Sequence, residues 1–216
     1  MRKSMLVLAN STKRNDRCIA GREIIEADNT YSFGPWIRPY SDRGEGELST
    51  LQRIIRPGRE VKVLDFAELS LSENMNNPVQ PENWAISTTP LWKLKTTFQL
   101  PKKGAFENLL EEFPDNLWIE PGCKTDRVSA DYLDDAPPDQ SLYLIKAEAF
   151  RIEVYTNSYN KVKYRGLFTY NDTDYDLGLT DPLMIHKWCH PIPGRLRHAG
   201  QSAINGNASR NRSESS

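Results

Sequence analysis

Short runs in which apolar and polar residues alternate, separated by turn signals, occupy most of this chain. Residues 4–10 and 17–25 are two such runs, joined by the polar residues 11–16, and residues 36–38 are a third that ends at Pro39. Alternation with a period of two is typical of β-strands, whereas helical periodicity is scarce here. The pattern therefore predicts a mainly β protein that begins with a hairpin.

The next segments predict a short helix followed by two more strands. Residues 49–55 place three apolar side chains on one face of a helix that Ser49 can cap, namely Leu51, Ile54 and Ile55. Residues 60–66 alternate as a strand, and residues 85–98 form a fifth run that Pro90 interrupts. Three strands, a helix and two strands are the elements of an OB-fold, a small five-stranded Greek-key barrel.

The last third of the chain contains the clearest strand signals. Residues 150–155 and 161–170 alternate, and residues 171–172 form a turn that leads into another alternating run. Folding this hairpin about its turn places Arg165 diagonal to Asp176, where the two side chains can form an ion pair. The sequence thus predicts a second group of antiparallel strands.

Three other segments have a distinct composition. Residues 104–113 carry apolar side chains at helical spacing and predict a helix. Residues 124–140 are rich in acidic residues and proline and predict a surface loop. Residues 195–216 consist mostly of Ser, Asn, Gly and Arg and predict a disordered tail.

The amino-acid composition indicates the cellular compartment in which the protein works. Of its 216 residues, 38% are hydrophobic and 26% are charged, with a formal net charge of −1. Acidic residues outnumber basic ones between residues 67 and 140, and the reverse holds on either side. Three widely spaced cysteines and the lack of a long apolar run favour a reducing, cytoplasmic location without a membrane partner.

Five short motifs, in order, give the chain a family resemblance. They are Cys18-Ile19-Ala20-Gly21, Trp36-Ile37-Arg38-Pro39, Gly46-Glu47-Leu48, Gln80-Pro81-Glu82-Asn83 and Thr180-Asp181-Pro182. Over roughly residues 4 to 192 the chain resembles the bacterial family described as dual OB-containing domains. The resemblance implies two OB-like barrels, which we place at residues 1–100 and 101–194, and a nucleic-acid-binding role.

OB barrels bind single strands by stacking bases on aromatic rings and by holding phosphates in a basic groove. Candidates for both roles lie on the first strands and on the strand pair near the C-terminus. They are Lys13, Arg14, Arg17, Arg22, Trp36, Arg38, Lys161, Lys163 and Arg165. Structural roles are the alternative, because Trp36 beside Ile37 and Pro39 also fits a core or inter-barrel position, and Arg38 also fits a buried bridge between loops.

A metal or catalytic centre has weaker support in the sequence. His186, Cys189 and His190 cluster, but their spacing is not that of a zinc ribbon or finger, so we expect no metal and no cofactor. Cys189 with His186, or Glu82 with Asp181, are candidate catalytic pairs without a nucleophile elbow or phosphate loop. Glu82 and Asn83 are better explained by capping a turn or by hydrogen bonds to backbone groups between the barrels, and we expect no catalysis.

The sequence therefore predicts a nucleic-acid-binding module for single-stranded DNA or RNA. One alternative is a protein-interaction accessory module of a bacterial defence or toxin system, which docks a partner protein through the acidic middle segment and exposed barrel edges. Another is a hydrolytic enzyme that uses His186 and Cys189. The first two differ in whether the basic groups of residues 13–38 and 161–165 converge on one groove.

Overall fold

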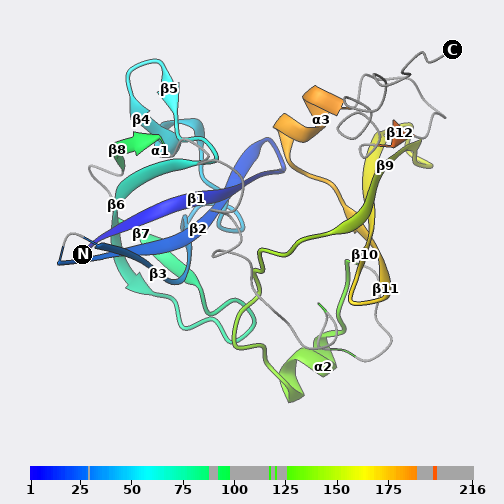
Figure 1. The fold of residues 1–216 in the computed structure, drawn as a ribbon, viewed down its shortest axis with the longest axis horizontal. Coiled ribbons are helices and arrows are strands. Elements are labelled where there is room, and N and C mark those ends of the chain that lie inside the picture. The colour runs from blue at the N-terminus through cyan, green and yellow to red at the C-terminus, as the bar shows by residue number, and fades with distance from the viewer. Residues whose placement is uncertain are drawn as a thin grey trace, which may run out of the picture.

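Strands are the main secondary structure of the described residues, as Figure 1 shows. The computed structural model of the protein describes residues 1–28, 30–87, 92–97, 117, 120, 126–188 and 197–198. Within these residues the helices are short: α1 (Thr50–Arg53), α2 (Ala130–Asp135) and α3 (Pro182–Trp188). The predicted mainly β fold with short helices is confirmed.

The N-terminal half is a closed five-stranded barrel. β1 (Arg2–Lys13), β2 (Asp16–Ala27) and β3 (Thr30–Tyr40) pair antiparallel in succession. β7 (Asn83–Ile86) pairs parallel with β3 and antiparallel with β6 (Asp65–Asn74). Because β6 also pairs with β1, the ring closes. The last strand thus lies between the third and the fourth, which is the order of an OB barrel and confirms the predicted first barrel.

The helix predicted over residues 49–55 is wrong in its extent and in its buried face. α1 ends at Arg53, and the chain continues as a hairpin of β4 (Ile54–Arg56) and β5 (Arg59–Glu60). Leu51, which the pattern placed on the buried face, is 77% exposed. The apolar spacing therefore misidentified the side of α1 that packs on the barrel.

Arg53 takes the buried position on α1 instead. Its side chain is 5% exposed and pairs with Asp16 at 3.3 Å and with Glu60 at 3.0 Å. It also donates to the Leu48 carbonyl and to the Thr50 hydroxyl. Five donors in a fixed fork allow one arginine to satisfy several acceptors, so Arg53 connects α1 to the β1–β2 hairpin and to β5.

Two predicted strands have different boundaries in the structure. The run over residues 60–66 does not form one strand, because Leu64 has φ 72° and the chain turns there before β6 begins. The run over residues 85–98 divides into β7 and β8 (Trp92–Thr97), which pair with successive stretches of β6. Pro90, where the sequence predicted the interruption, lies outside the described residues.

The core of the barrel consists of apolar side chains that point inward from its strands and from the segments around it. They are Met5, Val7, Ile19, Ile37, Leu48, Ile55, Val61, Ala67, Leu69, Leu71 and Trp92. Burial of this apolar surface is the main favourable contribution to the stability of the barrel.

A second antiparallel sheet follows in the C-terminal half, in the order β11-β10-β9-β12. Its strands are β9 (Glu148–Thr156), β10 (Val162–Tyr170), β11 (Thr173–Gly178) and β12 (Arg197–His198). The predicted ion pair across the β10–β11 hairpin is confirmed, since Arg165 Nε lies 2.7 Å from Asp176 Oδ1.

Several predictions fall on residues that the structure does not describe. These are the helix over residues 104–113, the side chains of Cys189 and His190, and the predicted tail apart from β12. The loop predicted over residues 124–140 contains α2, whose first turn is capped by the Ser129 hydroxyl accepting from the Tyr132 N–H.

The close approach of β1 and β2 at Gly21 is the basis of a stability prediction. A Cβ at this position would lie 2.0 Å from the Leu6 carbonyl oxygen, a backbone atom. We expect Gly21→Ala to lower the free energy of unfolding by about 3 kcal/mol, measured by urea denaturation. Gly34→Ala is the control, because its nearest neighbour is the end of the exposed Ile25 side chain. Equal losses in the two variants would contradict this account.

Candidate nucleic-acid interface

The tip of the β1–β2 hairpin carries three of the predicted cations, Lys13 at the end of β1, Arg14 in the turn and Arg17 on β2. Arg14 and Asn15 both have positive φ, 55° and 142°, and they form a two-residue turn. The strands therefore extend into residues 11–16, where the polar composition predicted a longer turn. Lys13 Nζ lies 3.3 Å from the Glu45 carboxylate, and Arg14 pairs with the same group. Glu45 partly neutralises this basic turn.

The loop of residues 41–48 supports the turn from one side. Arg17 and Leu48 exchange backbone hydrogen bonds of 3.3 and 2.8 Å. The pKa of Glu47 is lowered, first by its own backbone N–H and then by that of Glu45, against the opposing effect of burial. Arg17 donates to the Thr12 hydroxyl and has no carboxylate partner among the described residues.

The outer face of β2 and β3 is buried where Arg22 lies opposite Trp36. The Arg22 guanidinium carbon is 5.9 Å from the centroid of a Trp36 ring, and its Nε donates to the Gly34 carbonyl at 2.6 Å. Trp36 is 5% exposed. OB barrels bind many of their ligands on this face, so its burial here favours the core or inter-barrel alternative for Trp36.

Arg38 lies where the barrel meets the second half of the chain. Its Nη2 donates to Glu82 Oε1 at 2.7 Å and to the Ser141 hydroxyl oxygen at 3.0 Å, and its Nε donates to Asn83 Oδ1 at 2.7 Å. The Glu82 side chain is 3% exposed. Burial lowers the pKa of Arg38, and the nearby Glu82 carboxylate opposes that shift. The guanidinium is therefore committed to a buried bridge between loops.

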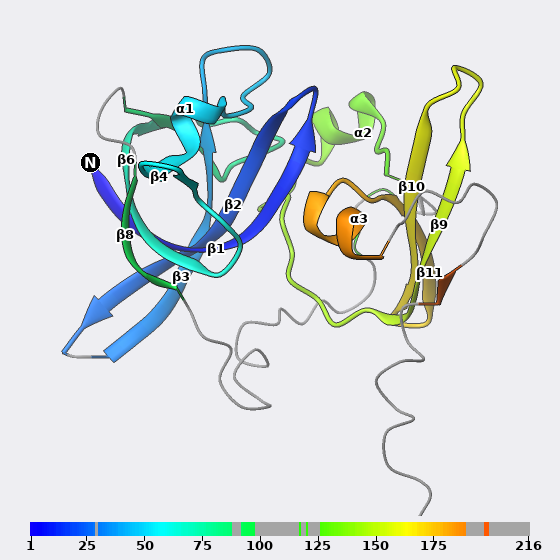
Figure 2. The same ribbon diagram turned by 90° about the horizontal axis from the view of Figure 1, so that it is seen from above.

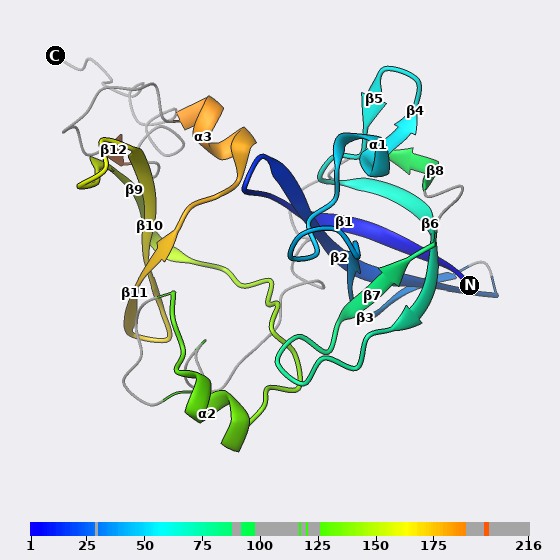
Figure 3. The same cartoon turned by 180° about the vertical axis from the view of Figure 1, so that it is seen from behind.

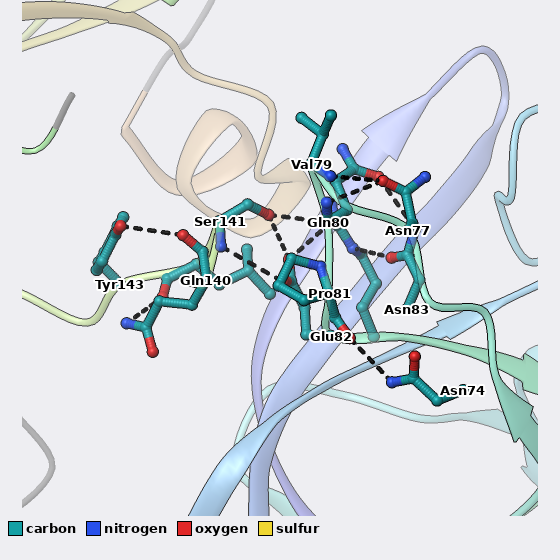
Figure 4. Close-up of polar contacts among 12 residues, drawn as sticks. Asn74, Asn77, Val79, Gln80, Pro81, Glu82, Asn83, Gln140, Ser141 and Tyr143 are labelled. Carbon is teal, nitrogen blue, oxygen red and sulfur yellow. Dashed lines mark hydrogen bonds and ion pairs between the residues drawn. The ribbon is translucent and has the colours of Figure 1, made fainter. Parts of the chain in front are cut away.

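The β6–β7 turn (residues 75–82) presents Glu82 to this bridge, as Figure 4 shows. The Asn77 side-chain oxygen accepts the backbone N–H groups of Val79 and Gln80 at 2.9 and 3.0 Å. Glu82 in turn accepts the backbone N–H of Ser141 at 3.3 Å as well as its hydroxyl. The prediction that Glu82 bonds a backbone group between the two halves is thus confirmed for one group, the Ser141 N–H, which donates to the carboxylate.

The β9–β10 hairpin combines exposed aromatic and basic side chains. Tyr159 is 81% exposed at its tip and Tyr155 is 42% exposed on β9, directly opposite Lys163 on β10. The Asn157 side chain shapes the tip by accepting the N–H groups of Tyr159 and Lys161 at 3.0 and 2.9 Å. Within the described part of the chain, neither Lys161 nor Lys163 pairs with a carboxylate.

Sequence reasoning named the two lysines and missed the two tyrosines. Tyr155 occupies a polar position in the alternation of β9, directly after the apolar position of Val154, and Tyr159 lies in a turn. Both positions indicate exposure for a large aromatic residue. An aromatic residue on the polar side of a predicted hairpin is the signal that could have identified them.

Arg165, further along β10, is occupied in the same way as Arg38. It pairs with Asp176 at 2.7 Å and with Asp126 at 2.8 Å, and it donates to the Asp176 carbonyl at the same time. The hydrogen bond to Asp176 raises the pKa of Arg165, and the charge of Asp126 adds to the effect. Its donors are thus used by Asp176 on β11 and by Asp126, which precedes α2.

The tips of the two basic hairpins lie on the same side of the molecule in Figures 1 and 2. In Figure 1 α3 is drawn between them, and in Figure 2 it is set back from the line that joins the tips. Figure 3 shows the same arrangement from behind. The Thr12 N–H donates to the Thr180 carbonyl at 2.8 Å, which fixes the start of α3 beside the β1–β2 turn. This side therefore carries Lys13, Arg14, Arg17, Lys161 and Lys163. Arg22, Trp36, Arg38 and Arg165 instead make the contacts described above.

Two of the candidate catalytic groups, Glu82 and Asp181, have structural roles. Asp181 caps α3 by accepting the N–H groups of Leu183 and Met184 at 2.7 and 3.0 Å. His186 is exposed on α3, and no cluster of metal-capable side chains occurs among the described residues. Cys18 is not one of the candidate catalytic groups, and burial raises the pKa of its thiol.

The barrel and its family place the protein among OB-fold domains. A family model described as the dual OB-containing domain matches residues 3–199, so the chain belongs to that family. No curated protein and no solved structure matches the chain. OB-fold domains in general bind oligonucleotides or oligosaccharides. Among the described residues the longest helix is α3, with 7 residues, and none is long and apolar enough to cross a membrane.

The environments of Arg38 and Arg165 predict very different stability losses. Arg38→Ala leaves the buried Glu82 carboxylate without its counter-ion, and we expect it to lower the free energy of unfolding by about 3–5 kcal/mol. Arg165→Ala is the matched control, because its partners Asp176 and Asp126 are 50% and 41% exposed and can be hydrated without it. We expect this variant to lower the free energy of unfolding by only about 1 kcal/mol. Urea denaturation compares the two, and similar losses would argue against a buried bridge at Arg38.

Proposed function

We propose that this protein binds single-stranded DNA or RNA, without catalysis, on the side that carries its two basic hairpins. The β9–β10 hairpin is the observation that supports this most strongly. It presents Tyr155 and Tyr159 next to Lys161 and Lys163, neither of which forms an ion pair with a carboxylate of the described residues.

This combination suits a single strand for two physical reasons. Unpaired bases stack on exposed aromatic rings, worth about 1–3 kcal/mol per base, and every base has a face to stack. Lysines along the same hairpin neutralise phosphates and release counter-ions, which favours binding of any sequence. Lys13, Arg14 and Arg17 extend the surface across α3, although Glu45 reduces the net charge of that end.

The proposal assigns the remaining candidates to the folded framework. Trp36 and Arg22 form the covered face of β2 and β3, Arg38 bridges the two halves, and Arg165 joins β10 to its neighbours. We retain the division into a first OB-like unit at residues 1–100 and a second at residues 101–194, with a cytoplasmic, cofactor-free protein, as parts of the same proposal.

A protein partner is the second candidate, and one observation favours it. Leu183, on α3 between the hairpins, is 59% exposed, which is unusual for a leucine in a surface devoted to phosphates. A partner protein whose interface has an apolar centre and an acidic rim would be complementary to Leu183 and to the basic hairpins around it. Binding of oligonucleotides that is lost at high salt distinguishes the nucleic-acid function from this alternative.

Removal of two lysines tests the phosphate contacts. We expect Lys161→Ala with Lys163→Ala to weaken the binding of all short single strands alike. The slope of log K against log salt should fall by about 1.4, the value for two phosphate contacts on a single strand. Fluorescence anisotropy at several salt concentrations measures both quantities. Arg14→Ala with Arg17→Ala should act in the same direction.

The matched control for this experiment removes two positive charges elsewhere. Lys93 and Lys95 are exposed on β8, on the opposite side of the barrel in Figure 1 from the β9–β10 hairpin. Lys93→Ala with Lys95→Ala should leave affinity and slope close to those of the unchanged protein. If both double variants lose the same affinity, the binding depends on net charge alone and the assigned surface is wrong.

Tyr159 tests the stacking contribution separately. Because its ring is exposed, Tyr159→Ala should leave the thermal midpoint unchanged while costing about 1–3 kcal/mol of single-strand affinity. Tyr159→Phe should recover most of that affinity, since the ring face is kept. An alanine variant that binds as tightly as the unchanged protein would remove stacking at this hairpin from the proposal.

A further inference from the structure

A cavity of about 480 Å³ lies between the β6–β7 turn of the barrel and the second half of the chain. Val79 and Gln80 line it on the barrel side, whereas α2, the chain before β9, and strands β10 and β11 line it on the other. Its volume falls within the range of small-molecule sites, about 300–1,000 Å³. Nothing in the nucleic-acid proposal uses this space.

The walls of the cavity are mainly apolar. Aliphatic and aromatic side chains cover them, including Val79, Val128, Leu133, Leu142, Ile145 and Phe168. Phe168 is held flat by stacking on Tyr175, with 5.5 Å between the ring centroids and 21° between the ring planes. A rigid aromatic face and aliphatic walls favour an apolar ring as occupant.

The polar groups at the cavity already have partners. Asp126, the one charged residue among the described lining residues, pairs with Arg165 at 2.8 Å. The Ser141 hydroxyl is bound to Glu82, and the Gln80 side-chain oxygen accepts from Asn83 at 3.1 Å. A charged ligand would lose its hydration here and gain no free counter-ion, which is unfavourable by several kcal/mol.

From these observations we propose that the cavity binds an uncharged, mainly apolar small molecule that contains a ring. Such a molecule contacts Val79 on the barrel and Leu133 on α2 at the same time. Its binding therefore stabilises the arrangement of the two halves around the Arg38 bridge. Nucleotides are poor occupants, because their phosphates would have no cation to meet.

A pair of dyes with the same rings tests the proposal on the intact protein. N-phenyl-1-naphthylamine is neutral, and 8-anilinonaphthalene-1-sulfonate adds one negative charge. We expect the neutral dye to bind at one saturable site per chain, at least about tenfold more tightly than the sulfonate, and to raise the Tm. Lack of saturable binding, or equal binding of the two dyes, overturns the proposal.

Variants on opposite walls locate the site. Val79→Trp and Leu133→Trp fill the cavity from the barrel and from α2, and each should lower the affinity for the neutral dye by at least about tenfold. Leu51→Trp is the control, because Leu51 is 77% exposed on α1 and does not line the cavity. Circular dichroism establishes that each variant is folded. Dye binding that is unchanged in both folded cavity variants places the dye elsewhere and overturns the proposal.

Discussion

The buried carboxylate of Glu82 constrains how the two halves of this protein meet. A charge removed from water destabilises the fold unless an opposite charge and hydrogen-bond donors surround it. Here Arg38 on β3 provides the charge, and the backbone and hydroxyl of Ser141 provide the donors. The barrel, the β6–β7 turn and the chain that enters the second sheet must therefore come together at one point. The cavity beside the turn is a consequence of this arrangement.

Arginine and lysine are used differently across the molecule. Arg38, Arg53 and Arg165 each satisfy several acceptors at once, which suits the planar fork of a guanidinium. Lys161 and Lys163 remain exposed, with a compact charge on a flexible stem. The fold thus uses these three arginines for internal contacts, whereas Arg14 and Arg17 remain with the lysines in the proposed binding surface. Basic composition alone would have overestimated the available binding surface.

Local patterns predicted much of the fold and only part of the candidate site. Alternation and turn residues predicted the succession of strands along the chain, and the tight turn at residues 171–172 predicted the β10–β11 pairing, because both depend on residues close in sequence. The pairings that close the barrel, β1 with β6 and β3 with β7, join residues far apart in sequence. Burial of Arg53 depends on Asp16, 37 residues away, and the fate of Arg38 depends on Glu82, 44 residues away. No local pattern contains such pairs. For the same reason, residue type alone identified Lys161 and Lys163 as exposed cations, whereas the contact of Arg38 with Glu82 became evident only from the three-dimensional structure.

The position of β6 in the barrel has a consequence for how the protein behaves in concentrated solution. Between Phe66 and Leu69 this strand pairs with β1 along one edge and with β8 along the other. Unpaired strand edges are templates on which other chains add and aggregate. Because both sides of its backbone are occupied, this stretch of β6 offers no such template, and self-association through the barrel would have to begin at another strand.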